Sequence, residues 1–159
     1  MTASHDDTPP LGQFEHPRSH DAIDCAGARV QVHDGSLATV LRVDGEIDAS
    51  NANLVTREIG RIWRLDTPLI VDLGTLDFLG IAGLRGLLEL EDENQPQLFV
   101  ITGPALQRLT RVISDAGLPI VHSVPEAVRL IEEALQAGRR LPQTLPDSEH
   151  RRTRPGRRD

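Results

Sequence analysis

The fold is decided by residues 68–90, which read PLIVDLGTLDFLGIAGLRGLLEL. A continuous apolar run from Leu69 to Val71, followed by Asp72, is typical of a strand buried on both faces in a sheet with helices on each side. After Gly74 we expect a loop over residues 75–79. A helix should follow, because leucines recur with the i, i+3, i+4 spacing of one helix face: Leu84, Leu87 and Leu88.

Between the expected strand and helix lies a segment of small and apolar residues: Gly80, Ile81, Ala82 and Gly83. Open α/β sheets place their working loops at such strand-to-helix junctions. The two glycines let another backbone, or a partner, approach without a Cβ in the way. This 80–83 segment is therefore the first candidate functional site.

Two strands and a helix are expected upstream of this stretch. Residues 29–33 and 37–43 alternate as strands around Asp34-Gly35, a strong hairpin signal. The second strand closes with Gly45-Glu46-Ile47-Asp48, and the next helix has three candidate capping residues: Asp48, Ser50 and Asn51. Its inner face is expected to contain Val55, Ile59, Ile62 and Trp63.

Downstream, strands and helices alternate. Buried strands are expected at 98–101 and 120–121, with a helix opened by Gly103-Pro104 between them. The expected apolar stripe of that helix is Leu106, Leu109, Val112 and Ile113. Ser123 and Glu126 form a capping box for a last helix that ends at Gly138 and buries Ala127, Leu130, Ile131, Ala134 and Leu135. The order ββαβαβαβα predicts an α/β fold with a mainly parallel central sheet of about five strands and four helices.

Several of these motifs resemble the STAS domain and, within that group, the bacterial anti-sigma factor antagonists (anti-anti-sigma factors). The likeness rests on the following residues: Val71-Asp72-Leu73, Phe78-Leu79, Gly83-Leu84 and, at the expected distance upstream, Gly45-Glu46-Ile47-Asp48. It covers about residues 27–137 and implies a STAS-like (SpoIIAA-like) fold. The sequence differs from the family pattern in the middle of the 80–84 motif. There the family's Asp falls on Gly80, its phosphorylated Ser on Ile81 and its second hydroxyl residue on Ala82.

The resemblance implies a module that binds an anti-sigma factor with a kinase-like ATPase fold and thereby releases a sigma factor. By the same resemblance, the 80–83 segment lies beside a loop that carries Glu46, Asp48, Ser50 and Asn51, and both form the partner-binding face. Because Ile81 and Ala82 have no hydroxyl, we expect an antagonist that is not regulated by phosphorylation at the usual position. An exposed Ile81 would be an apolar anchor, whereas a buried Ile81 would be a core residue.

Two other functions remain open, namely a small-ligand sensor and a scaffold in a stress-signalling complex. No catalytic set, zinc spacing or phosphate-binding Gly-rich motif is found, so the sequence favours a non-enzymatic protein without metal or cofactor. Glu46 and Asp48 could also be metal ligands or an acid/base pair, but no clustered His or third carboxylate accompanies them. The simpler interpretation is that Asp48 caps the helix and that Glu46 faces solvent or a partner.

Charge and composition suggest a cytoplasmic protein that binds neither DNA nor a membrane. The net charge is −7, and the last 22 residues hold seven Arg against three acids, so the rest is strongly acidic. A nucleic-acid-binding face is normally basic. The single Cys25 fits a reducing compartment, and no apolar run approaches the ~20 residues of a membrane span.

We expect a STAS domain over 27–137 between disordered tails at 1–26 and 138–159. In the first tail, Thr2 and Thr8 are candidate phosphorylation sites for a Ser/Thr kinase, since both lie within four residues of Asp6, and a phosphate would add a charge of about −1.5 to −2. The Arg-rich second tail would attract RNA or anionic lipid only weakly, and a solubilising tail is the simpler interpretation.

Overall fold

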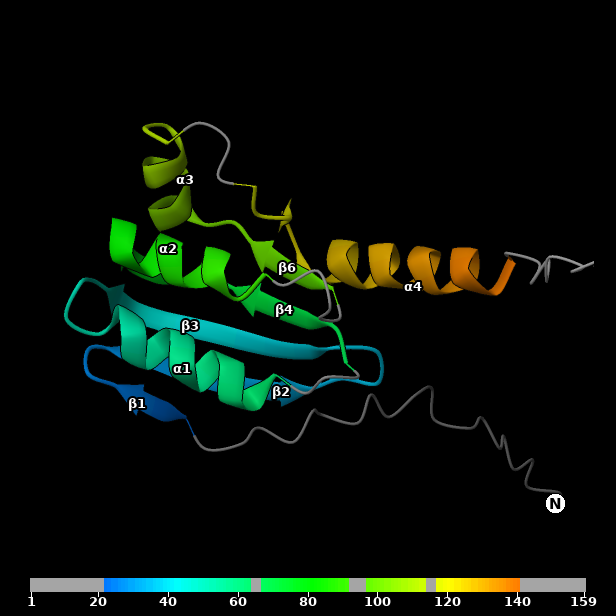
Figure 1. Ribbon diagram of the computed structural model, residues 1–159, viewed down its shortest axis with the longest axis horizontal. Helices are drawn as coiled ribbons and strands as arrows, with labels where there is room; N and C mark the ends of the chain where they lie inside the picture. Colours follow the sequence, from blue (N-terminus) through cyan, green and yellow to red (C-terminus); the bar gives the residue numbers. More distant parts are fainter. Residues whose placement is uncertain (1–21, 64–66, 92–96, 114–116, 141–159) are drawn as a thin grey trace, which may run out of the picture.

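The computed structural model describes residues 22–63, 67–91, 97–113 and 117–140, with side chains as far as residue 138. In this part of the chain one sheet of seven strands is accompanied by four helices (Figure 1). The strands are β1 (Ile23–Cys25), β2 (Ala28–Asp34), β3 (Thr39–Ile47), β4 (Leu69–Asp72), β5 (Leu76–Leu79), β6 (Leu98–Ile101) and β7 (Ile120–Val121). The helices are α1 (Ala52–Ile62), α2 (Ile81–Glu89), α3 (Pro104–Thr110) and α4 (Val124–Arg140).

The sheet is mixed, with spatial order β1-β2-β3-β4-β6-β7 and β5 paired to β3. The first three strands are antiparallel, and β3, β4, β6 and β7 run parallel. The alternation of strands and helices in the sequence predicted that these later strands would be parallel. The predicted α/β fold is therefore confirmed. The sheet has two more strands than expected, β1 and β5.

The β3 strand pairs with two strands in succession. Its residues Thr39–Arg42 pair with β4, and after an irregularity at Gly45/Glu46 its last residues pair with β5. A turn links β4 to β5, in which Leu76 N–H donates to the Leu73 carbonyl and Gly74 N–H donates to Asp72 Oδ1. The prediction of a loop over 75–79 was therefore wrong for 76–79, which is strand.

Helices cover both faces of the sheet. Helices α1 and α2 lie side by side over one face, α4 packs against β4 and β7 beneath the other, and α3 packs against β5 (Figure 1). Strand β4 is buried on both faces, because Leu69 and Val71 belong to the cluster under α1 and α2 while Ile70 belongs to the cluster against α4. The apolar run that decided the fold therefore has the predicted position.

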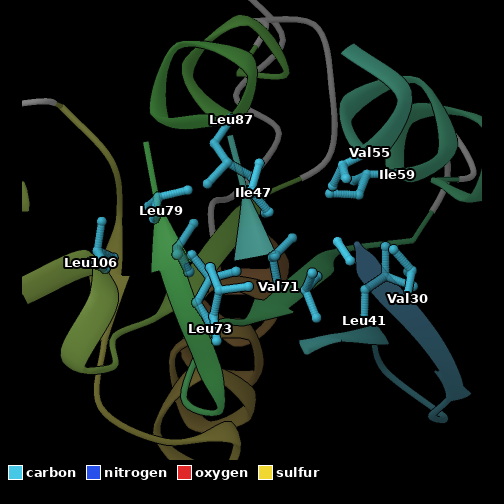
Figure 2. Close-up of a cluster of buried hydrophobic side chains, with 14 of the residues drawn as sticks. Val30, Leu41, Ile47, Val55, Ile59, Val71, Leu73, Leu79, Leu87 and Leu106 are labelled. Atoms are coloured by element: carbon cyan, nitrogen blue, oxygen red, sulfur yellow. The ribbon is translucent and has the colours of Figure 1, made fainter. Parts of the chain in front are cut away.

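The larger core cluster joins the sheet to α1 and α2, and Figure 2 shows its central side chains. Val55 and Ile59 of α1 point toward Val30 and Leu41 of the sheet, and Leu87 of α2 points toward Ile47 (Figure 2). Trp63 is buried and Ile62 packs against the cluster, so the predicted inner face of α1 is confirmed.

Close contacts fix α2 against its neighbours. A Cβ at Gly83 would lie 2.7 Å from Ile47 Cγ2, and a Cβ at Gly86 would lie 2.1 Å from Thr56 Oγ1. No side chain fits at either position without movement of a neighbour. These two glycines therefore set the height of α2 above β3 and its distance from α1, and so they position the start of α2.

Four expectations about element ends need correction. Strand β1 lies inside the segment expected to be a tail, and β3 begins at Thr39 and continues to Ile47. Val112 follows the end of α3 and is 81% exposed, so it does not belong to the buried stripe, whereas Ile113 packs against the core as predicted. On α4 the expected inner residues Ala134 and Leu135 are exposed, because the helix extends past the sheet edge and continues to Arg140 (Figure 1).

The capping box before α4 is present in modified form. Ser123 Oγ accepts the Glu126 N–H at 3.3 Å, as predicted. The Glu126 carboxylate, however, accepts the N–H of His122 at 2.7 Å, one residue before the expected donor. Both ends of the box still satisfy backbone donors at the start of the helix.

Candidate functional site

The candidate site lies at the carboxyl ends of β3 and β5. Gly80 N–H donates to the Ile47 carbonyl at 2.8 Å, which ties the start of α2 to the end of β3. A Cβ at Gly80 would lie 3.7 Å from the Asp48 Cα, so the two backbones are neighbours. The 80–83 segment and the 48–51 loop therefore lie side by side, at the edge of the sheet where open α/β folds place their ligands.

A hollow of about 580 Å³ opens between these segments and α3. We call it the α2–α3 groove, and it is lined by Asp48, Ala49, Phe78, Leu79, Gly80, Ile81, Ala82, Ala105, Arg108 and Leu109. Leu79 and Ala105 are buried and form its floor. Phe78 and Ile81, 48% and 54% exposed, stand at its rim. Two large apolar side chains are thus presented to solvent around a largely apolar hollow.

The exposure of Ile81 decides between the two interpretations of this residue. Ile81 is the first residue of α2, after an N-cap position occupied by Gly80 in an extended conformation without a side-chain cap. Its side chain is not core, and the turn is not covered by other described segments. Gly83, in contrast, is buried against Ile47 and Leu79, so its role is in packing.

The 48–51 loop is held by its own side chains. Asp48 Oδ1 accepts hydrogen bonds from the N–H and the hydroxyl of Ser50. Asn51, only 2% exposed, accepts the Asp48 N–H through Oδ1 and donates through Nδ2 to the carbonyls of Ala26 and Glu46. Asn51 is therefore a structural residue that ties three segments together.

The predicted caps of α1 were wrong in detail. Asn51 stands at the N-cap position but makes no side-chain hydrogen bond to the helix, since its amide points back into the loop. Hydrogen bonds from Ser50 lower the pKa of the Asp48 carboxyl below its ordinary value. Asp48 and Ser50 stabilise a turn, and only Asp48, Ser50 and Glu46 of the predicted loop set reach the surface.

Sequence reasoning missed the α3 wall of the groove. Arg108 donates from Nη2 to the Asp77 carbonyl at 2.8 Å, which holds α3 against β5. Arg108 has no carboxylate partner among the ion pairs of the described residues. Nothing local in the sequence of α3 indicates this position, because the contact joins segments 31 residues apart.

Other predicted residues lie away from the groove or outside the described ranges. Cys25 is a buried free thiol on β1, and burial raises its pKa, as for an unreactive cysteine. Thr2, Thr8 and the Arg-rich tail over 141–159 lie outside the described residues. In the described ranges, no group of three metal-ligating side chains is found, and no helix has the length and apolarity that crossing a membrane requires.

Comparison with known proteins finds a matching family model, a relative in sequence and a solved structure of similar fold. Residues 23–101 match the family model of the STAS domain. Osmosensory protein A of Mycobacterium tuberculosis is 27% identical over 128 residues, which cover 76% of this chain and 81% of that protein. The crystal structure of an anti-sigma factor antagonist from Mycobacterium paratuberculosis matches with a TM-score of 0.59 and 25% identity, over 66% of this chain and 94% of that one.

The family match begins at the first residue of β1 and ends at the last residue of β6. It therefore includes both the 48–51 loop and the 80–83 segment. Helix α3, which supplies Ala105, Arg108 and Leu109 to the groove, lies beyond it.

Proposed function

Because this chain carries a STAS domain with the fold of an anti-sigma factor antagonist, we propose that it binds an anti-sigma factor and thereby releases a sigma factor. The partner we propose has a kinase-like ATPase fold. Binding alone would perform this function, without catalysis or a cofactor, in the cytoplasm where sigma factors act.

The observation that carries the proposal is the pair of exposed apolar side chains at the groove rim. Phe78 and Ile81 are about half exposed on adjacent segments, around a hollow floored by buried apolar residues. Large apolar residues gathered on a surface mark protein-binding sites, and aromatic or aliphatic anchors at the centre of an interface contribute most of its affinity.

The charges around the groove favour a partner with a basic surface. Asp48 lines the groove and is half exposed. Glu46 and Asp77 are exposed next to the rim residue Phe78, Glu46 as its partner on β3 and Asp77 as its neighbour on β5. Such acids would chiefly raise the association rate and exclude acidic competitors. The net negative charge predicted for the chain outside its C-terminal tail is thus also found around the groove.

We further propose that phosphorylation of the 80–83 segment does not regulate this binding. By the resemblance of the sequence, Ile81 falls where the family has its phosphoacceptor. Ile81 is exposed, and neither it nor Ala82 carries a hydroxyl. Ser50, the hydroxyl residue of the neighbouring loop, donates its hydrogen to Asp48. Control by a Ser/Thr kinase would then act elsewhere, and Thr2 and Thr8 remain the proposed positions.

A capture experiment tests the main proposal. The full chain would be immobilised as wild type, as Ile81→Glu and as Leu135→Glu, whose leucine is 45% exposed on α4, away from the groove. We expect wild type and Leu135→Glu, but not Ile81→Glu, to retain a protein from the source organism that mass spectrometry identifies as having a kinase-like ATPase domain. Equal capture by all three, or capture of no such protein, would contradict the proposal.

A second candidate function, a small-ligand sensor, is favoured by the size of the groove. Its volume of about 580 Å³ lies within the roughly 300–1,000 Å³ of pockets that bind small molecules. A ligand-dependent rise in the melting temperature of the isolated chain would support this function.

A further inference from the structure

We propose that the α2–α3 groove binds a single-chain fatty carboxylate, with the aliphatic chain in the hollow and the carboxylate on Arg108. The proposal deepens the ligand-sensor candidate. It also rests on the antagonist function in one respect, because it makes ligand and protein partner competitors for one surface.

The hollow exists because small residues line it. Four of its lining positions are Gly or Ala: Ala49, Gly80, Ala82 and Ala105. A Cβ at Gly80 would meet only ordinary contacts at 3.5 Å, so the backbone does not forbid a side chain there. Where the STAS pattern places an acid and two hydroxyl residues, this chain has Gly80, Ile81 and Ala82. The wall formed by α2 is therefore apolar and suited to an aliphatic chain.

The charge at the α3 end favours an anionic head group. One hydrogen bond from Arg108 Nη2 to the Asp77 carbonyl fixes the guanidinium at the groove. Its other N–H donors pair with no carboxylate among the described residues. A guanidinium held in this way is suited to bidentate recognition of a carboxylate.

The second charge of the groove sets the direction of the ligand. Strand β5 pairs with β3 on one side and packs against α3 on the other, so Asp48 and Arg108 approach the groove from opposite sides. Asp48 accepts two hydrogen bonds from Ser50 and stays ionised. A carboxylate would be repelled from the Asp48 side, and the head group therefore lies beside Arg108.

Occupancy of the groove would also control access to its rim. An aliphatic chain against Leu79 and Ala82 would pack between Phe78 and Ile81, the two side chains proposed to contact the partner. Fatty carboxylate and anti-sigma factor would then exclude each other. Such competition would supply a reversible control at a site that cannot accept a phosphate.

Titration calorimetry with sodium decanoate, below its micelle concentration, tests the binding. We expect saturable binding to the delipidated full chain, at least about tenfold weaker in Arg108→Gln, because a charge-assisted hydrogen bond is lost. Arg108→Lys should recover part of the affinity, and the control Arg129→Gln on α4 should bind as wild type. Decanol, which has no charge, should bind wild type and Arg108→Gln alike.

Filling the hollow provides a second test that leaves Arg108 in place. Ala82→Leu should abolish decanoate binding while the melting temperature shows that the domain is folded. Absence of saturable decanoate binding, equal affinities of wild type and Arg108→Gln, or unchanged binding by Ala82→Leu would each overturn the proposal.

Competition separates this inference from the antagonist function. Saturating decanoate should reduce capture of the kinase-fold partner by wild type at least tenfold, and unchanged capture would overturn the competition. Partner capture without decanoate binding would refute the proposed fatty-carboxylate site and leave the antagonist function supported. Decanoate binding without partner capture would refute the antagonist function alone.

Discussion

Replacement of Ile81 by alanine should weaken partner binding more than it weakens the fold. Burying a whole isoleucine side chain contributes about 1.5–3 kcal/mol. Ile81 is 54% exposed in the free chain, so an interface that covers it would gain about 0.8–1.6 kcal/mol from this residue. Ile81→Ala should therefore raise the Kd by about four- to fifteen-fold.

The fold should change little, because alanine favours helix formation and offsets part of the lost burial at the first position of α2. Urea unfolding should place the change in unfolding free energy within about 1 kcal/mol. Ile81→Glu distinguishes the effect on partner binding from the effect on stability more clearly. The first turn of α2 has no acidic residue, so a carboxylate there would stabilise the helix by about 0.3–1 kcal/mol, yet it would place a charge in an apolar interface.

The measurement is the Kd for the captured anti-sigma factor by biolayer interferometry, with urea unfolding of the same samples. Leu135→Ala is the matched control, because Leu135 is an apolar helix residue of similar exposure on the opposite face. The reasoning fails if Leu135→Ala and Ile81→Ala change the Kd equally. It also fails if Ile81→Glu binds the partner as wild type does.

Four further predictions concern the surroundings of the site. Gly86→Ala should lower the unfolding free energy by up to about 2 kcal/mol in urea titrations, and adding Thr56→Ala should recover stability, because Thr56 Oγ1 causes the clash. Asn51→Ala should cost about 2–4 kcal/mol in the same assay, since three hydrogen bonds are lost and buried backbone groups are left unpaired. Hydrogen bonds lower the folded-state pKa of the Asp48 carboxyl below its ordinary 3.8. The stability that the ionised carboxylate adds is therefore complete above pH 3.8 and is lost as the pH falls through the lowered pKa. The unfolding free energies of wild type and Asp48→Asn, measured against pH, should converge at low pH. Buried Cys25 should resist a thiol reagent in the native protein and react at once in urea.

The sequence predicted those parts of the fold in which hydrophobicity alone decides. Strands β4 and β6 are buried at every residue, so a continuous apolar run identifies them without knowledge of their neighbours. Strand β5 has only Leu76 and Leu79 buried, with two exposed residues between them, and shows no period of two. It is a strand because it pairs with the end of β3, and that pairing is not visible locally.

The candidate site, too, could be predicted only in part, because some of its contacts depend on tertiary packing. The 48–51 loop and the 80–83 segment were expected to lie side by side because of the resemblance to the STAS pattern, and no local pattern in either segment indicates the contact. The α3 wall was missed because its position depends on packing against β5. The opposite error occurred at Val112 and Leu135, where the helical spacing of apolar residues continues although the side chains are 81% and 45% exposed. Periodicity predicts which face is apolar, and tertiary packing decides how far it is buried.

The choice of isoleucine at position 81 is hard to explain by folding alone. The first residue of a helix needs no intrahelical acceptor for its N–H, so serine or glutamate would be accommodated equally well. A β-branched side chain is a poorer helix former than alanine or glutamate, and 54% of Ile81 faces water without stabilising the core. Contact with an apolar surface would turn that exposed area into binding free energy. Both proposed occupants of the groove supply such a surface, and neither requires a hydroxyl at position 81 or 82.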